Sequence, residues 1–325
     1  MKQNTFVLKS SPHFRDKDSV SKIMYTVVLS LIPAVIASVY FFRLKAVLIY
    51  ITCVATCLAT EAVFLKVRKK DLRSLWDGSA IITGMLLAMT LPPSLSLDLV
   101  IIGSVMAIAL GKQVFGGLGY NVFNPALVGR AFLQLAFPVA MTTWIPPVTL
   151  NVNTATFATP LGNLKFQSSL TQGALIPLKD LFWGNVGGCL GETSAAALLL
   201  GALFLLFRRV IDWRIPAGVI SSLILFTGAF WLAQPDSYAS PLFHVLAGGL
   251  IIGAFFMATD MVTSPINPLG TWIYALGIGV LVGLIRLFGG FPEGVMFSIL
   301  FMNTFVPLIN RYTRPRILGE RRGAS

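Results

Sequence analysis

The stretch KIMYTVVLSLIPAVIASVYFF, residues 22–42, carries a single charge, on Lys22 at its start. An α-helix rises about 1.5 Å per residue and a hydrocarbon core is about 30 Å thick, so the stretch is long enough to cross a membrane. It lacks the alternation of apolar and polar residues that is typical of barrel strands. The stretch therefore predicts a transmembrane helix.

The rest of the chain has the same character. Of its 325 residues 55% are hydrophobic and only 12% are charged, with a mean hydropathy of +0.79, whereas soluble domains carry about 25% charged residues. This composition predicts an all-α integral membrane protein. The net charge of +12 does not indicate nucleic acid, because the basic residues flank apolar runs. No cleavable signal pattern precedes the first run, which should stay in the membrane as an anchor.

Ten apolar runs are candidate spans, which gives a chain of about ten transmembrane helices. They cover residues 22–42, 46–65, 78–92, 97–115, 124–138, 190–207, 215–233, 241–258, 270–288 and 294–310. If the N-terminus is cytoplasmic, 19 of the 25 basic residues lie in inside segments and five in outside segments. This bias predicts that both termini are cytoplasmic.

The predicted topology divides the chain into five parts. They are a cytoplasmic tail (1–21), a first membrane repeat (22–138), an extracytoplasmic loop (139–186), a second membrane repeat (187–310) and a second cytoplasmic tail (311–325).

The two membrane parts share a motif. Gly84-Met-Leu-Leu-Ala-Met-Thr90 matches Gly253-Ala-Phe-Phe-Met-Ala-Thr259, and a span ending in Phe-Gly-Gly follows each copy. Because the first copy begins inside and the second outside, the halves would be inverted repeats; chance similarity between apolar segments is the alternative. Such repeats place binding sites at short broken helices near the midplane. The glycine-rich segment 116–125 is the predicted interruption.

Three carboxylates lie within spans or at their ends: Glu61, Glu192 and Asp260. Inserting a charged side chain near the centre of a membrane helix costs about 2.5–3.5 kcal/mol, so we expect each carboxylate to face a cavity, a partner or water. Asp260 occupies a polar break between two apolar runs and is a candidate for an ion pathway. For Glu192 a helix-capping role beside Thr193 and Ser194 is an equal alternative.

Other chemistry has little support in the sequence. Cys53 and Cys57 lie four residues apart on one helix face and Cys189 lies far along the chain; packing is the simplest reading, and a cluster shared with a partner chain stays open. No phosphate-loop or dinucleotide motif occurs. We expect no catalytic residue and no metal site in this chain, and we read His244 as a packing residue.

Five motifs, in order, resemble one family over nearly the whole chain. The motifs are Gly116-Gly-Leu-Gly-Tyr-Asn-Val-Phe-Asn-Pro-Ala-Leu-Val-Gly129, Phe137-Pro-Val-Ala-Met-Thr-Thr-Trp144, Leu190-Gly-Glu-Thr-Ser194, Phe256-Met-Ala-Thr-Asp260 and Tyr312-Thr-Arg-Pro-Arg316. On these motifs the chain resembles the D subunit of the Rnf complex, the ion-pumping ferredoxin:NAD oxidoreductase, and through it the B subunit of the sodium-translocating NADH:quinone oxidoreductase.

The resemblance implies a covalent flavin in the outer loop. In that family a flavin transferase joins FMN through a phosphoester to the last threonine of a pattern Asp, Ser or Thr, Gly, Ala, Thr, which maps here onto Asn153, Thr156, Phe157, Ala158 and Thr159. Thr159 would be the acceptor. Asn153 stands where the family has an acid and Phe157 where it has glycine, which bears on how efficiently the loop is modified. A plain threonine-rich turn is the alternative.

The implied function is electron relay coupled to Na⁺ or H⁺ translocation, within a multi-subunit complex in the cytoplasmic membrane of a bacterium or archaeon. The resemblance also implies a non-covalent riboflavin, for which no residue stands out, and peripheral and membrane partner subunits in the lipid bilayer. The chain would be a subunit of a translocase and incomplete as a catalyst. Two rivals fit the apolar pattern: a cofactor-free secondary transporter or channel with inverted repeats, and a scaffold subunit.

Overall fold

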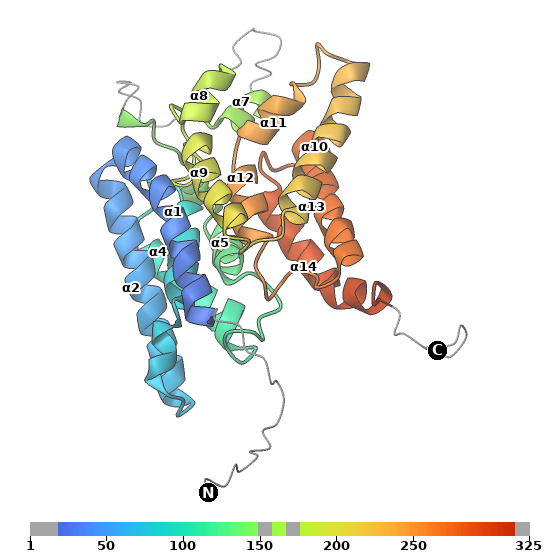
Figure 1. The fold of residues 1–325 in the computed structure, drawn as a ribbon. Coiled ribbons are helices and arrows are strands. Elements are labelled where there is room, and N and C mark those ends of the chain that lie inside the picture. Colours follow the sequence, from blue (N-terminus) through green and yellow to red (C-terminus); the bar gives the residue numbers. More distant parts are fainter. Residues whose placement is uncertain (1–18, 149–157, 167–175, 316–325) are drawn as a thin grey trace, which may run out of the picture.

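A computed structural model describes residues 19–148, 158–166 and 176–315, and all regular elements within these ranges are helices. Four helices are long and apolar enough to cross a membrane: α1 (Val20–Phe42), α2 (Leu44–Val67), α10 (Arg214–Ala233) and α13 (Pro268–Phe288). In Figure 1 helix α1 lies beside α2 at one side of the bundle, and α10 lies beside α13 at the other. This confirms the expected all-helical membrane protein.

Shorter helices fill the space between these four. The first half adds a 3₁₀-helix (Leu72–Asp77), α3 (Ser79–Met89), α4 (Leu97–Ile108) with a π-helix (Ala109–Gln113), α5 (Pro125–Ala136) and α6 (Pro138–Met141). The middle segment adds α7 (Pro160–Phe166) and α8 (Leu178–Trp183). The second half adds α9 (Ala195–Phe207), α11 (Pro241–Leu246), α12 (Leu250–Ile252) with a π-helix (Gly253–Met257), and α14 (Val295–Tyr312).

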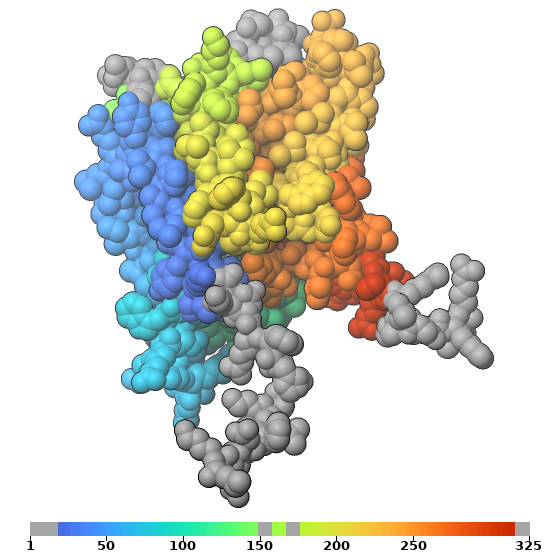
Figure 2. All heavy atoms as spheres, viewed as in Figure 1, coloured from blue at the N-terminus to red at the C-terminus, as the bar shows by residue number. Residues whose placement is uncertain are grey.

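The two halves of the chain pack against each other. Helix α1 packs on α9, and Figure 2 shows the blue atoms of α1 beside the yellow atoms of α9. Within the halves, α2 packs on α3 and α4, and α10 packs on α13. Gly201 makes the first contact close, because a Cβ at this position would collide with the Ser30 carbonyl oxygen.

Large apolar side chains point outward from the bundle. On α1 these include Leu29, Ile36 and Tyr40, and Phe207 at the end of α9 is 88% exposed. Contiguous apolar surface of this extent is unfavourable in water, and it suits hydrocarbon or a partner helix. The outer surface thus agrees with a protein that is embedded in a membrane.

The glycine-rich segment 116–125 interrupts the helices as the sequence predicts. Gly116, Gly117 and Gly119 all have positive φ, between 91° and 128°, a region that glycine adopts without strain. The new helix then begins at Asn124, whose Oδ1 accepts hydrogen bonds from the backbone N–H groups of Ala126 and Leu127. Pro125 follows at the first helical position, where its missing N–H costs nothing.

One sequence expectation needs correction. The run 241–258 is not one helix, because Gly248 at φ +71° breaks it between α11 and α12. Two basic residues that enter the charge count are buried rather than exposed at the ends of spans. Lys112 is fully buried and paired with Glu61, and Arg286 is buried in the last turn of α13.

Some expectations fall outside the described residues. They concern the ends of both tails (1–18 and 316–325) and part of the outer loop, including Asn153, Thr156 and Phe157. The three cysteines are described, and all of them are buried with free thiols.

Candidate functional site

A cavity of about 680 Å³ lies among α5, α7, α12 and the start of α14. It is called the outer cavity below. Its polar lining includes Thr90, Arg130, Gln134, Thr142, Thr159, Glu192 and Glu293, and its apolar lining includes Leu127, Trp144, Ile252, Met257, Phe291 and Phe297. Its volume falls in the range of about 300–1,000 Å³ that is usual for ligand and cofactor pockets.

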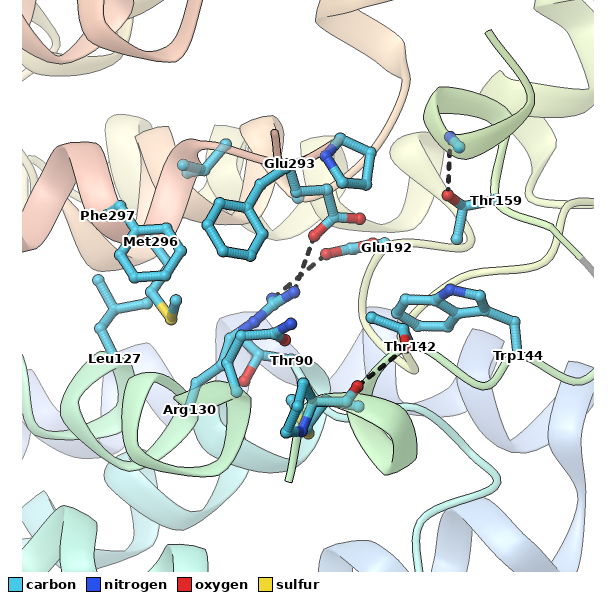
Figure 3. Close-up of a pocket in the computed structure, with 18 of the residues that line it drawn as sticks. Thr90, Leu127, Arg130, Thr142, Trp144, Thr159, Glu192, Glu293, Met296 and Phe297 are labelled. Carbon is cyan, nitrogen blue, oxygen red and sulfur yellow. Dashed lines mark hydrogen bonds and ion pairs between the residues drawn. The ribbon is translucent and has the colours of Figure 1, made fainter. Parts of the chain in front are cut away.

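Arg130 is the charged centre of this cavity. Its side chain extends from α5 and donates to Glu192 Oε1 at 3.4 Å and to Glu293 Oε2 at 2.8 Å, as Figure 3 shows. The Arg130 side chain is only 10% exposed, so both carboxylates compensate a charge that is largely removed from water.

Glu192 reaches Arg130 because its loop is fastened to the end of α3. The backbone N–H groups of Leu190 and Gly191 donate to the carbonyl oxygens of Leu91 and Met89, at 3.1 and 2.7 Å. Only glycine fits at position 191, where a Cβ would lie 2.5 Å from the Met89 Cβ. Of the predicted capping residues, Ser194 does cap α9, through a 3.3 Å bond from the Ala197 N–H.

Thr159 lies on the wall of the same cavity and precedes α7 as its N-cap. Its Oγ1 accepts a 3.1 Å hydrogen bond from the Gly162 N–H, drawn in Figure 3, and its carbonyl accepts from the Asn163 N–H at 2.8 Å. The residue is only 4% exposed. The predicted acceptor and the predicted acid Glu192 therefore share one cavity.

A smaller cavity, of about 100 Å³, lies near the start of α1 and is called the inner cavity. Its polar lining includes Ser79, Lys112, Asn121, Asn124, Thr259 and Asp260. Asp260 accepts hydrogen bonds from the Val262 N–H at 3.3 Å and the Thr263 hydroxyl at 3.2 Å. Among the described residues no ion pair to Asp260 is found within 4.0 Å.

Glu61, the third predicted acid, forms a buried ion pair beside the inner cavity. Lys112 Nζ lies 2.5 Å from Glu61 Oε1 and 2.6 Å from the Ser79 hydroxyl oxygen. Gln113 adds a 3.2 Å bond to the same carboxylate oxygen. The other oxygen, Oε2, is buried without a hydrogen-bond partner in the described chain.

The π-helix Gly253–Met257 separates the two cavities. Met257 lines the outer cavity, whereas Phe255 and Phe256 line the inner one. Asn124 fixes this wall, because its Nδ2 donates to the Met257 carbonyl at 3.2 Å while its Oδ1 caps α5. Two of the motifs that carry the family resemblance thus meet in space. π-helices recur at functional sites.

Sequence reasoning missed Arg130, Glu293 and Lys112 as partners of the predicted acids. A signal was present for two of them, since a basic residue in an apolar span requires a partner and an acid is the natural one. Glu293 lies after the Phe-Gly-Gly motif and looked like an ordinary loop residue. Its pairing with Arg130 spans 163 positions of the chain.

Comparison with known proteins identifies the family of this chain. Residues 7–319 match the model of the NQR2, RnfD, RnfE family. The chain belongs to this family. Among its relatives, the D subunit of the proton-translocating ferredoxin:NAD(+) oxidoreductase complex of Clostridium ljungdahlii is 48% identical, over 99% of this chain and 98% of the relative.

Two further relatives in the NQR2, RnfD, RnfE family cover nearly the whole chain. The D subunit of the Na(+)-translocating ferredoxin:NAD(+) oxidoreductase complex of Acetobacterium woodii is 44% identical, over 98% of this chain and 97% of the relative. The D subunit of the ion-translocating oxidoreductase complex of Stutzerimonas stutzeri is 41% identical, over 94% and 93%. One of the three names specifies protons and another Na⁺.

Proposed function

We propose that this chain is the D subunit of an Rnf-type ferredoxin:NAD oxidoreductase, and that it carries FMN on Thr159. Family membership and the names of the relatives support the complex. One observation carries the cofactor assignment: Thr159, the position that matches the family's acceptor, lies on the wall of the outer cavity.

The residues of the outer cavity fit such a group. Trp144, Phe291 and Phe297 offer apolar and aromatic surface to a planar ring. Thr159 supplies the attachment oxygen, and Arg130 and Gln134 supply hydrogen-bond donors. When bound, FMN supplies one- and two-electron transfer, and the protein's contribution is to hold it and set its surroundings. A second flavin, riboflavin, belongs to the proposal without an assigned site.

The chain's own part in attachment is to present the Thr159 hydroxyl. In the structure that oxygen accepts the Gly162 N–H and the residue is almost fully buried. A transferase requires access to its acceptor, because the hydroxyl must lose its proton to a base and meet a phosphorus atom. We infer that α7 leaves the cavity wall during modification and returns afterwards.

The ion pathway is proposed to use Asp260, Glu61 and Glu192. Asp260 and Lys112, the partner of Glu61, line the inner cavity, and Glu192 lines the outer one. Buried acids in a membrane protein typically bind a cation or relay protons. The π-helix Gly253–Met257 lies between the two cavities. An ion that passes from one cavity to the other would require this π-helix to change its conformation.

The ten spans and the inverted repeats are part of the same proposal. Both copies of the repeat motif end in a buried threonine whose hydroxyl donates to the preceding helix, Thr90 to the Leu87 carbonyl and Thr259 to the Phe255 carbonyl, each at 2.7 Å. Helix α1 begins and α14 ends toward the end of the bundle opposite α7 and α8 in Figure 1. This arrangement supports termini on the side opposite α7 and α8, which the bias of the basic residues makes the cytoplasmic side; the proposed membrane is the bacterial or archaeal inner membrane.

A gel experiment separates this function from its rivals, a cofactor-free transporter or channel and a scaffold. The chain is produced with the flavin transferase, purified, denatured and run on a gel under ultraviolet light. We expect a fluorescent band at the mass of the chain, which depends on the transferase being present. The transferase is shown to be active by the labelling of another of its substrates in the same cells. A band of this chain that stays non-fluorescent under that condition favours the rivals.

A further inference from the structure

Helix α7, which begins directly after Thr159, is held in place by Lys165 in its last turn. The ammonium nitrogen of Lys165 donates to three carbonyl oxygens: those of Ile285 and Arg286, at 3.1 Å each, and that of Phe291, at 3.0 Å. Ile285 and Arg286 belong to the last turn of α13. The lysine thus joins α7 to the C-terminal end of a long membrane helix.

The position suits a cation for two reasons. The last carbonyl groups of a helix have no partner within the helix, and the C-terminal end of the helix dipole is negative. Partial burial lowers the pKa of the Lys165 amine, and the three oxygens offset that cost for the charged form. All three donor positions of the ammonium group are used, so the contact has little freedom to slide.

The other end of α7 is fixed by packing. Leu161 is 3% exposed and belongs to a small apolar cluster with Leu181, Phe243 and Ala247. Its methyl group lies against Gly248, where a Cβ would approach the Leu161 Cδ1 to 2.8 Å. The helix that follows Thr159 is therefore fixed by an apolar anchor two residues after it and by a charged anchor six residues after it.

We propose that Lys165 is a positioning residue that latches α7 to the end of α13 and thereby holds Thr159 at the wall of the outer cavity. The inference deepens the proposed function, since Thr159 is the proposed acceptor. It also identifies the contacts that must break when α7 leaves the cavity wall: those of Lys165 with the end of α13, which stays in place.

The test measures how often position 159 opens to solvent, without using flavin. Thr159→Cys is made in four backgrounds: unchanged, Lys165→Met, Lys165→Arg and Lys179→Met. Each protein, assembled in its complex, reacts with an impermeant maleimide, and the labelling rate follows the open population when closing is fast. Lys179 is the matched control, because it is an exposed lysine on the neighbouring α8.

Lys165→Met is expected to raise the labelling rate about tenfold, which is the scale of one lost charge-assisted hydrogen bond. Lys165→Arg keeps a cation with donors and should stay near the unchanged background, and Lys179→Met should have no effect. Equal rates in Lys165→Met and Lys179→Met would overturn the latch. So would a parallel rise at the buried native residues Cys53, Cys57 and Cys189, because that rise reports general loosening.

If Lys165→Met does not accumulate, Lys165→Gln replaces it, because the amide retains two donors and should give an intermediate rate. A Lys165→Gln rate equal to that of the unchanged background overturns the latch. A second readout uses the flavin itself: iodide should quench the fluorescence of the Lys165→Met protein more strongly than that of the parent. If the parent chain carries no flavin, the proposed cofactor is wrong, and the maleimide rates still decide the role of Lys165.

Discussion

The ammonium nitrogen of Lys112 lies 2.5 Å from Glu61 Oε1, and neither side chain is more than 3% exposed. The contact joins α2 to the π-helix that follows α4, 51 positions away in the sequence. At this depth, each charge is tolerable only because the other is present. The pair therefore holds two spans of the first half in register beside the inner cavity.

Removing one member of this pair should destabilise the protein far more than removing both charges. Lys112→Met leaves a buried carboxylate without its cation, which costs about 3–5 kcal/mol. The double variant Lys112→Met with Glu61→Gln should recover most of that loss. Thermal unfolding in detergent, followed by the loss of monodisperse protein, measures both. A double variant no more stable than Lys112→Met alone would show that the pair does not act as a unit.

Asp260 is predicted to matter for ion coupling more than for folding. Asp260→Asn removes the charge and keeps one acceptor oxygen, which can still take the hydrogen bond from either the Val262 N–H or the Thr263 hydroxyl, so the complex should assemble with its flavin content intact. Ion transport per electron in proteoliposomes should fall. Asp98→Asn, a change at an exposed acid in the first turn of α4, should leave that ratio unchanged. Loss of assembly in Asp260→Asn would instead mean a structural role.

The segment that holds α7 and α8 is predicted to face away from the cytoplasm. Lys179→Cys should react with an impermeant maleimide added to intact cells, because Lys179 is exposed on α8. Lys69→Cys, in the exposed turn after α2, should react only after permeabilisation. The reverse pattern would invert the whole topology, and equal labelling of both sites in sealed cells would invalidate the assay's sidedness.

The two departures from the family's flavin pattern are predicted to reduce modification rather than abolish it. Restoring both residues, Asn153→Asp with Phe157→Gly, should leave labelling of Thr159 equal or higher when transferase is limiting. In-gel fluorescence normalised to protein gives the comparison. A restored chain that labels less well than the natural one would mean that this chain and its transferase have adapted to Asn153 and Phe157.

The helical fold was predictable because apolar length and charge placement are local properties of the sequence. Each of the ten expected runs contains at least one helix, and the glycine-rich break before Asn124 occurs where glycine and proline require it. The division of the run 241–258 was less visible, since Gly248 and Gly249 are tolerated in many membrane helices. Its cause is the positive φ of Gly248, which depends on tertiary contacts with α7.

The site was predictable only in part, because its partners come from distant segments. The sequence indicated that Glu61 and Glu192 need compensation, but Lys112 and Arg130 lie 51 and 62 positions away from them. Lys112 was missed as the partner of Glu61 because nothing local in the sequence shows which distant acid a lysine within an apolar span will meet. Lys165 was invisible for the same reason: its three acceptors are backbone carbonyls more than 100 positions further along the chain.

The central claim is that Thr159 carries the flavin, and mass spectrometry of the proteolytic peptide that contains it tests this most directly. The chain is produced with an active transferase as the natural sequence and as Thr159→Ala, Thr159→Ser and Thr156→Ala. We predict an FMN adduct on Thr159 in the natural chain and in Thr156→Ala, partial labelling in Thr159→Ser, and none in Thr159→Ala. An adduct that survives in Thr159→Ala, or a natural chain without any adduct, would contradict the account.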